Sequence, residues 1–186
     1  MNVARVITTA ALLFAGSLML ATAFAQDNRH SVSPEDKHFM SEAAEGGLAE
    51  VELGHLAAEK AASTKVRDLG DRMVRDHSEA NDKLKDIARR LGVNVPDHLS
   101  ATEYAEKTKL SALSGDHFDR AYVNDMLKDH RQDLAEFRRE ARDGQNPEVK
   151  AFASQTLPIL EERLRLAEQT NRDITRQTSS VTRGGQ

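Results

Sequence analysis

The stretch MVRDH at residues 73–77 is repeated almost unchanged as MLKDH at residues 126–130. Each copy reads Met, branched apolar residue, cation, Asp, His, and each lies within a long segment of helical periodicity. Because residues four apart lie on one face of a helix, the Met and the His of each copy point the same way. The repeat therefore predicts two related helices whose His77 and His130 side chains face a shared interior.

Four long helices are predicted from apolar residues that recur three and four positions apart. Two of their starts, Ser33-Pro34 and Asn146-Pro147, place a capping residue before a proline in the first turn. Gly46-Gly47 interrupts the first helix, so we expect another helix to approach it closely there. The predicted helices cover residues 34–62, 65–91, 116–142 and 147–172.

The lengths of the connections predict the topology. Short connections join the helices into two antiparallel hairpins, and the second hairpin repeats the first. The middle connection, residues 93–115, contains a short helix over residues 100–113 and is long enough to run from one end of a bundle to the other. We therefore predict an all-α fold: a ferritin-like antiparallel four-helix bundle from a duplicated helical hairpin, within a domain of residues 34–175. Residues 26–33 are expected to be a flexible N-terminus and residues 176–186 a disordered tail.

The N-terminal segment has the pattern of a signal peptide. Arg5 supplies a positive charge, residues 6–20 form an apolar stretch, and Ala23-Phe24-Ala25 is a small-residue cleavage site. We expect residues 1–25 to be removed and the protein to be exported to the periplasm or cell envelope. Retention of the segment as an N-terminal anchor is the alternative. No transmembrane domain is expected after cleavage.

The composition excludes several classes of function. The net charge is −4 at pH 7, whereas nucleic-acid binding calls for a basic surface, so no nucleic-acid partner is expected. Cysteine is absent, which rules out disulfides, thiolate catalysis and cysteine-based metal sites. The sequence contains no Gly-x-Ser-x-Gly elbow and no glycine-rich phosphate loop. We therefore expect a protein without enzymatic activity.

Four stretches of the chain together are typical of one family. They are GGLAEVELG at residues 46–54, MVRDH at residues 73–77, the segment of residues 122–130, and Thr156-Leu157-Pro158. With these marks the chain resembles the bacterial exported family catalogued as domain of unknown function 4142, over roughly Asp36 to Ala167. The resemblance implies a ferritin-like four-helix bundle in the envelope or periplasm. It implies no established activity.

A polar layer is predicted in the middle of the bundle. The helical stripes place Glu50, His77, His130 and Arg163 near mid-bundle on four different helices. In the first interpretation this layer is structural: Glu50 and Arg163 form a buried charge pair, and the histidines donate to carboxylates or carbonyls. Members of the family that this chain resembles usually carry a histidine at the position of Arg163. In this chain the Arg163 guanidinium would supply a cation there.

In the second interpretation the same layer binds a metal ion as cofactor. The two imidazoles of His77 and His130 and the carboxylate of Glu50 suit a divalent transition metal such as Cu, Zn, Fe or Mn. The thioethers one turn before the histidines would instead suit Cu(I). The wider set of candidate ligands adds Asp76, Asp129, Met73 and Met126.

A catalytic di-iron centre is not expected, because the last three long helices carry no Glu-x-x-His pair. A third interpretation is an interaction module that acts through its charged faces. Its partner would be an envelope protein or a second copy of the chain. A metal protein should respond to chelators, whereas an interaction module should not.

Overall fold

A computed structural model describes the backbone of residues 31–184 and the side chains of residues 31–177. Throughout this part of the chain the regular elements are five α-helices with no strand, which confirms the predicted all-α class. None of these helices is long and apolar enough to cross a membrane. The predicted signal peptide, residues 1–25, lies outside the described residues. The helices are α1 (Pro34–Lys60), α2 (Thr64–Leu91), α3 (Ala101–Ser111), α4 (Gly115–Asp143) and α5 (Pro147–Gly184).

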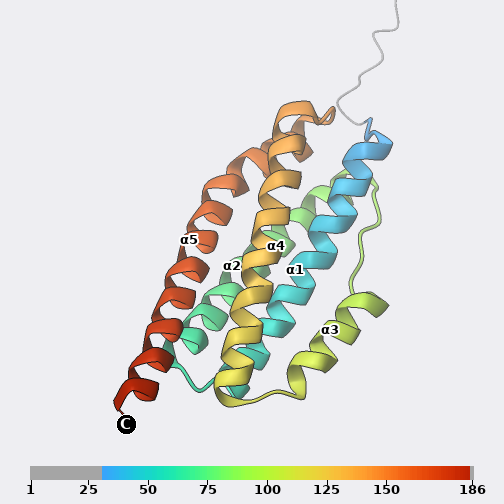
Figure 1. Cartoon of the computed structure of the whole chain (residues 1–186). Coiled ribbons are helices and arrows are strands. Elements are labelled where there is room, and N and C mark those ends of the chain that lie inside the picture. The colour runs from blue at the N-terminus through green and yellow to red at the C-terminus, as the bar shows by residue number, and fades with distance from the viewer. Residues whose placement is uncertain (1–30, 185–186) are drawn as a thin grey trace, which may run out of the picture.

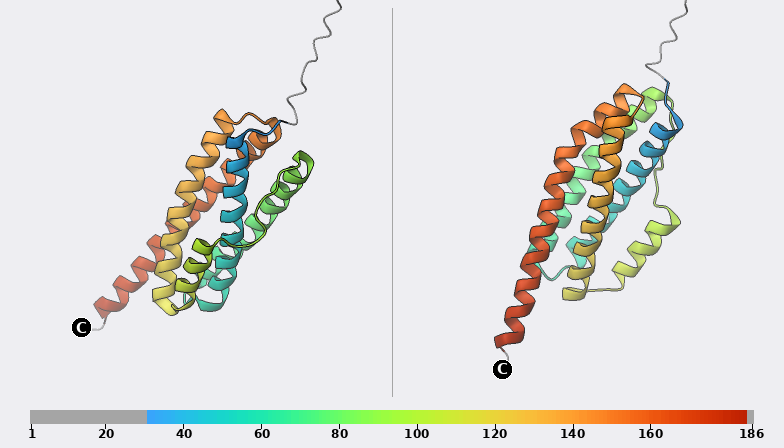
Figure 2. Two further views of the ribbon diagram at one scale, coloured as in Figure 1. Left: turned by 90° about the vertical axis from the view of Figure 1, so that its right-hand side faces the viewer. Right: turned by 45° about the horizontal axis from the view of Figure 1, so that its top comes forward.

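Four long helices lie side by side, and the short helix α3 lies outside them (Figure 1). α1 packs along α2 and α4 packs along α5, and in addition α1 contacts α4 and α2 contacts α5. The connection between α2 and α4 runs back along the helices and brings α3 against α1 and α4 (Figure 2). Each long helix therefore turns one face toward a shared interior.

The helix ends follow the capping residues of the sequence. The hydroxyl of Ser33 accepts a hydrogen bond from the backbone N–H of Asp36, and the Asp36 carboxylate accepts one from the N–H of Ser33. Together with Pro34 in the first turn, this capping box begins α1. Gly92 ends α2 in the left-handed conformation, with a φ of 65°. The first three long helices end close to their predicted positions.

The last helix is longer than the sequence predicted. α5 continues to Gly184, whereas we expected an end near Arg172 and a disordered tail over residues 176–186. No proline or glycine occurs between Arg172 and Arg183, so this stretch contains no strong helix breaker. The last turns of α5 extend past the ends of the neighbouring helices (Figure 1).

Apolar side chains fill the interior in two clusters, which are separated by a polar layer. On every long helix, buried polar side chains stand between the members of one cluster and those of the other, and on α2 there are two, His77 and Asn81. The polar layer consists of Glu50 on α1, His77 on α2, His130 on α4 and Arg163 on α5. The first cluster includes Leu53, Leu69, Met73, Tyr122 and Met126, and the second includes Phe39, Leu84, Leu134, Phe152 and Leu160.

Glycine allows α1 and α2 to approach closely. Of the two predicted positions, Gly46 and Gly47, only Gly47 lies close to α2. A Cβ atom at Gly47 would overlap the side chain of Asn81 on α2, whereas a Cβ atom at Gly46 would meet nothing within 4 Å. Further along α1, a Cβ atom at Gly54 would lie 2.7 Å from the carbonyl oxygen of Gly70 on α2. The two backbones therefore meet at Gly54 and Gly70 rather than at Gly46.

Asp36 joins the start of α1 to the connection between α4 and α5. Its carboxylate accepts hydrogen bonds from the backbone N–H groups of Gln145 (2.9 Å) and Asn146 (3.0 Å). The side-chain amide of Asn146 in turn donates to the carbonyl oxygen of Ser31 at 3.2 Å. The described end of the predicted flexible N-terminus is therefore attached to the rest of the fold.

Glu140, near the end of α4, is buried beside Asp36. Burial raises the pKa of Glu140 to about 7, and the neighbouring Asp36 carboxylate acts in the same direction. Burial would also raise the pKa of Asp36, but the backbone N–H donors of Gln145 and Ser33 lower it instead. In mildly acidic solution Asp36 is therefore ionised while Glu140 keeps its proton.

We expect the free energy of unfolding to fall as the pH rises from about 5 to about 8. Unfolding returns the pKa of Glu140 from about 7 to its ordinary value of 4.5, so the folded state holds the proton more tightly. The stabilisation is complete when the pH is below the pKa of Glu140 in the unfolded chain. It is lost as the pH rises through the pKa of Glu140 in the folded protein. Urea unfolding should show that Glu140→Gln removes on the order of 1–3 kcal/mol of this decline. The exposed Glu59→Gln is the control, and an undiminished decline in Glu140→Gln would refute the assignment.

Gly46→Ala and Gly54→Ala should change stability in opposite directions. Alanine at position 46 meets no neighbour and favours the helix by about 0.5–1 kcal/mol. Alanine at position 54 would press against the Gly70 carbonyl and should destabilise the fold by about 1–3 kcal/mol. Thermal unfolding of the two variants measures both effects. Equal melting temperatures would contradict the close backbone contact between α1 and α2.

Candidate functional site

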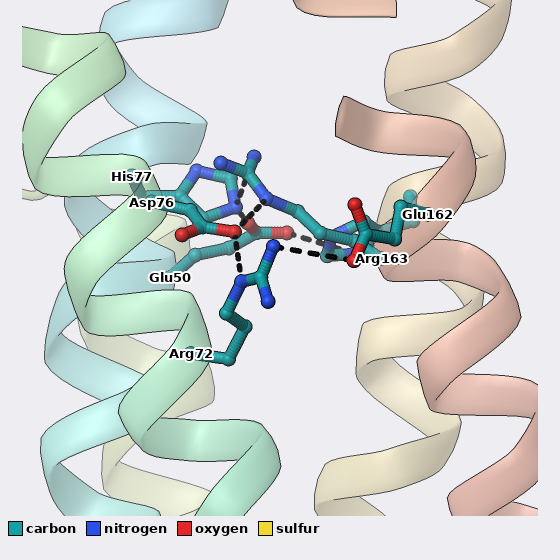
Figure 3. Close-up of polar contacts among 7 residues, drawn as sticks. Glu50, Arg72, Asp76, His77, Glu162 and Arg163 are labelled. Atoms are coloured by element: carbon teal, nitrogen blue, oxygen red, sulfur yellow. Dashed lines mark hydrogen bonds and ion pairs between the residues drawn. The ribbon is translucent and has the colours of Figure 1, made fainter. Parts of the chain in front are cut away.

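The polar layer draws one side chain from each long helix into the middle of the fold. Each of the four residues continues the inward stripe of its helix, which is why apolar neighbours surround it on both sides. The exposed fractions are 3 % for Glu50, 5 % for His77, 0 % for His130 and 2 % for Arg163. Figure 3 shows Glu50, His77 and Arg163 pointing toward one another from α1, α2 and α5.

Glu50, His77 and His130 form a compact group of potential metal ligands. Each offers one ligand atom, and the three atoms lie within 4.8 Å of one another. His77 Nε2 is in contact with Glu50 Oε2, and His130 Nδ1 lies 3.3 Å from Glu50 Oε1. The two imidazole rings stand edge to face, with centroids 5.8 Å apart. Among the described residues, no other three His, Asp or Glu side chains form such a group.

Arg163 does not form the predicted charge pair with Glu50. Its Nε lies 3.4 Å from Asp76 Oδ2, and its Nη1 lies 3.0 Å from His77 Nε2 (Figure 3). Arg72 also holds Asp76, with its Nε 2.6 Å from the same carboxylate oxygen. The predicted pair is replaced because α5 packs against α2, which places the Asp76 carboxylate within reach of the guanidinium.

The hydrogen-bond partners show where the imidazole lone pairs lie. A guanidinium can only donate, so His77 Nε2 accepts from Arg163 and carries a lone pair. The same His77 nitrogen is in contact with Glu50 Oε2, so these two potential ligand atoms lie side by side. His130 Nδ1 lies 2.9 Å from the carbonyl oxygen of Met126, which can only accept, so the hydrogen is on Nδ1 and the lone pair on Nε2. A histidine that donates one ring N–H to a carbonyl is oriented to bind metal through its other nitrogen.

Several buried polar atoms in and near the layer lack hydrogen bonds. Among the described residues, neither carboxylate oxygen of Glu50 nor His130 Nε2 has a hydrogen-bond partner. The same holds for the hydroxyl of Tyr122, two turns before His130 on α4. Buried polar atoms are nearly always satisfied in folded proteins. The donor set and its unsatisfied atoms therefore fit a bound cation.

The sequence model of a family described as Domain of unknown function (DUF4142) matches residues 21–170. The chain belongs to the DUF4142 family. This membership confirms the resemblance found in the sequence motifs. No curated protein matches this DUF4142 chain by sequence.

A crystal structure of a DUF305 fragment from Deinococcus radiodurans is similar to this DUF4142 chain. The TM-score is 0.67 and the sequence identity is 19 %, over 76 % of this chain and 98 % of the fragment. At this identity the likeness shows a shared fold and nothing about activity.

The protonation states in the DUF4142 layer follow from burial and from neighbouring charges. Burial by itself would raise the pKa of Glu50, but the imidazoles of His130 and His77 and the charge of Arg163 lower it to about 2. Burial lowers the pKa of His77, and this effect outweighs the opposing attraction of Glu50. At neutral pH an ionised carboxylate therefore lies next to the neutral imidazole of His77, and both forms are able to bind metal.

The other predicted ligands lie outside the group of three. Asp76 is occupied by two arginines, and Asp129 lies 3.4 Å from Lys128. Burial raises the pKa of Asp129 to about 6, and the charge of Glu50 adds to this. Met73 and Met126 are fully buried members of the first apolar cluster, where a flexible thioether fills space between neighbours.

An acidic pocket of about 310 Å³ lies between α1, α3 and α4. Glu50 is among its lining residues, so the pocket touches the polar layer. No lysine or arginine is among the described residues that line it. Eight carboxylate side chains line this acidic pocket: Glu42, Glu45, Glu50, Glu103, Glu106, Asp129, Asp133 and Glu136.

Sequence reasoning missed the acidic pocket, because carboxylates are common everywhere in a chain with 30 % charged residues. A local signal existed: Asp129, Asp133 and Glu136 recur at helical spacing on α4, and Glu42 and Glu45 do so on α1. The sequence does not show that α3 packs against both helices and closes the third wall. That arrangement depends on tertiary contacts of the long connection.

Proposed function

We propose that this DUF4142 protein is an exported envelope protein that binds one divalent transition-metal ion through Glu50, His77 and His130. The observation that carries the proposal is the buried group of two imidazoles and one carboxylate, whose ligand atoms lie within 4.8 Å of one another. Imidazole nitrogen and carboxylate oxygen are suitable donors for the divalent ions of Mn, Fe, Zn and Cu.

Two properties support a metal site over a purely structural layer. A structural layer requires each buried polar group to be paired, yet the Glu50 oxygens and His130 Nε2 lack hydrogen bonds among the described residues. Arg163 lowers the pKa of Glu50 through its charge, but its ion pair is with Asp76 rather than with Glu50. A bound dication would satisfy these ligand atoms together and would offset the buried negative charge.

The proposal concerns binding or handling of an ion and does not extend to catalysis. Three protein ligands leave coordination positions for water or another small ligand. Arg163 donates to the lone pair of His77 that an ion would use, so binding would shift this guanidinium onto Asp76 alone. A divalent ion is preferred to Cu(I), because Met73 and Met126 pack in the first apolar cluster rather than in the polar layer.

The proposal includes a ferritin-like four-helix bundle and export. The bundle is supported by two helical hairpins, one long connection, and ligands on facing helices. Export is supported by the signal-peptide pattern of residues 1–25. N-terminal sequencing of the protein from the envelope fraction should begin at Gln26, and a chain that begins at Met1 would argue against cleavage.

Calorimetric titration of the tag-free mature protein with Zn²⁺ or Mn²⁺ should give about one ion per chain. His77→Ala and His130→Ala should each weaken binding by at least about tenfold, since each removes one of three protein ligands. Binding to the folded state should also raise the melting temperature of the natural chain, and a chelator should reverse this increase.

The matched control is His55→Ala, because His55 is an exposed histidine on α1, the helix that carries Glu50. This variant should bind the ion as tightly as the natural chain. A natural chain that binds no divalent ion, with a melting temperature unaffected by metal or chelator, would refute the proposed function and leave the polar layer as architecture.

A further inference from the structure

The acidic pocket is bordered by three helices and carries charge of one sign. Glu45 comes from α1, Glu106 from α3 and Glu136 from α4. The third wall, α3, is attached to α1 by an ion pair between Lys107 Nζ and Glu52 Oε2 at 2.5 Å. The long connection between the two hairpins thus completes a negatively charged cavity on one side of the helices.

The acidic pocket meets the proposed metal site at one residue. Glu50 lines the pocket and also belongs to the group of three ligands, whereas His77 and His130 do not line it. The Glu50 side chain is only 3 % exposed, and its two oxygens have no hydrogen-bond partner among the described residues. A buried residue of the ligand group therefore also borders a cavity lined by other carboxylates.

The other acids of the pocket do not form a second metal site of the same kind. Among the described residues, Glu50, His77 and His130 are the single group of three ligands close enough to share an ion. The remaining carboxylates of the pocket are distributed around its walls. This distribution suits attraction of a mobile cation better than its final coordination.

We propose that the acidic pocket is the route by which a hydrated divalent metal ion reaches Glu50 from solvent, with Glu45 and Glu106 promoting its capture. This inference rests on the proposed function, because it assigns the path to the same ion site. The ion is first attracted by the pocket carboxylates and then exchanges bound water for Glu50 and the two imidazoles.

Electrostatics and size both fit this role. A cleft lined by one sign of charge concentrates counter-ions and can raise association rates by about 10- to 1,000-fold. One water molecule occupies about 30 Å³ in the liquid, so a pocket of about 310 Å³ has room for an ion with its first hydration shell. Burial raises the pKa of Glu103, and the charges of Glu45 and Glu106 raise it further, as expected for carboxylates close together.

The test is the association rate of Co²⁺, followed by stopped-flow absorbance, in the natural chain and in the double variant Glu45→Gln/Glu106→Gln. Among the described residues neither glutamate makes a hydrogen bond or ion pair, so both amides should be tolerated in the fold. At low ionic strength the association rate should fall at least about fivefold while the dissociation rate stays unchanged. The natural rate should also decrease with added NaCl more steeply than that of the variant.

The matched control is Glu59→Gln/Asp82→Asn, which removes the same charge from exposed positions outside the pocket. It should bind Co²⁺ at close to the natural rate. Equal rates in the pocket variant and in the control would overturn the route while leaving the metal site standing. If the pocket variant lost binding while His130→Ala bound Co²⁺ fully, the pocket itself would be the final site and both proposals would be overturned. A natural chain that binds no Co²⁺ would also overturn both proposals.

Discussion

A carboxylate placed among apolar side chains is costly unless positive charge or hydrogen-bond donors compensate it. Glu50 is in this position: it stands between two apolar clusters, and the neighbouring imidazoles and guanidinium keep it ionised. The arrangement of the interior follows from this constraint. His77 and His130 must face Glu50 from α2 and α4, and Arg163 must remain near enough on α5 to contribute its charge.

The same constraint fixes how far each helix can slide along its neighbours. A shift of one turn would move Glu50 into an apolar cluster and would separate it from both histidines. The close contact of Gly54 with Gly70 holds α1 and α2 in this register, and Asp36 ties the start of α1 to the loop that begins α5. A buried polar layer thus lowers stability in itself but specifies one alignment of the long helices. It also leaves unsatisfied ligand atoms that a metal ion would fill.

Much of this organisation is visible in the sequence, because it depends on local periodicity. The repeated stretch that ends in His77 and His130 places both residues on inward stripes, and the structure brings them together with Glu50 and Arg163. The partner of Arg163 was not predictable, since periodicity says which face a residue occupies but not which atom lies opposite. Asp76 lies beside the inward-facing stripe of α2, and its carboxylate forms the ion pair with the Arg163 guanidinium.

Features that depend on tertiary contacts or on weak local preferences were also missed. The acidic pocket requires α3 to pack on α1 and α4, and nothing in the sequence of the connection specifies that position. The extension of α5 to Gly184 shows that a stretch rich in Ser and Thr continues a helix when no strong breaker interrupts it. The acidic pocket and the longer α5 change what surrounds the polar layer, but the four residues that form the layer are the predicted ones.

The most direct test of the central claim is an anomalous difference map from crystals of the mature protein grown with Zn²⁺, recorded at the zinc absorption edge. A bound ion predicts one strong peak about 2.0–2.2 Å from an oxygen of Glu50 and from one nitrogen each of His77 and His130. A polar layer with no anomalous peak, and with Glu50 hydrogen-bonded to the two imidazoles alone, would contradict the account.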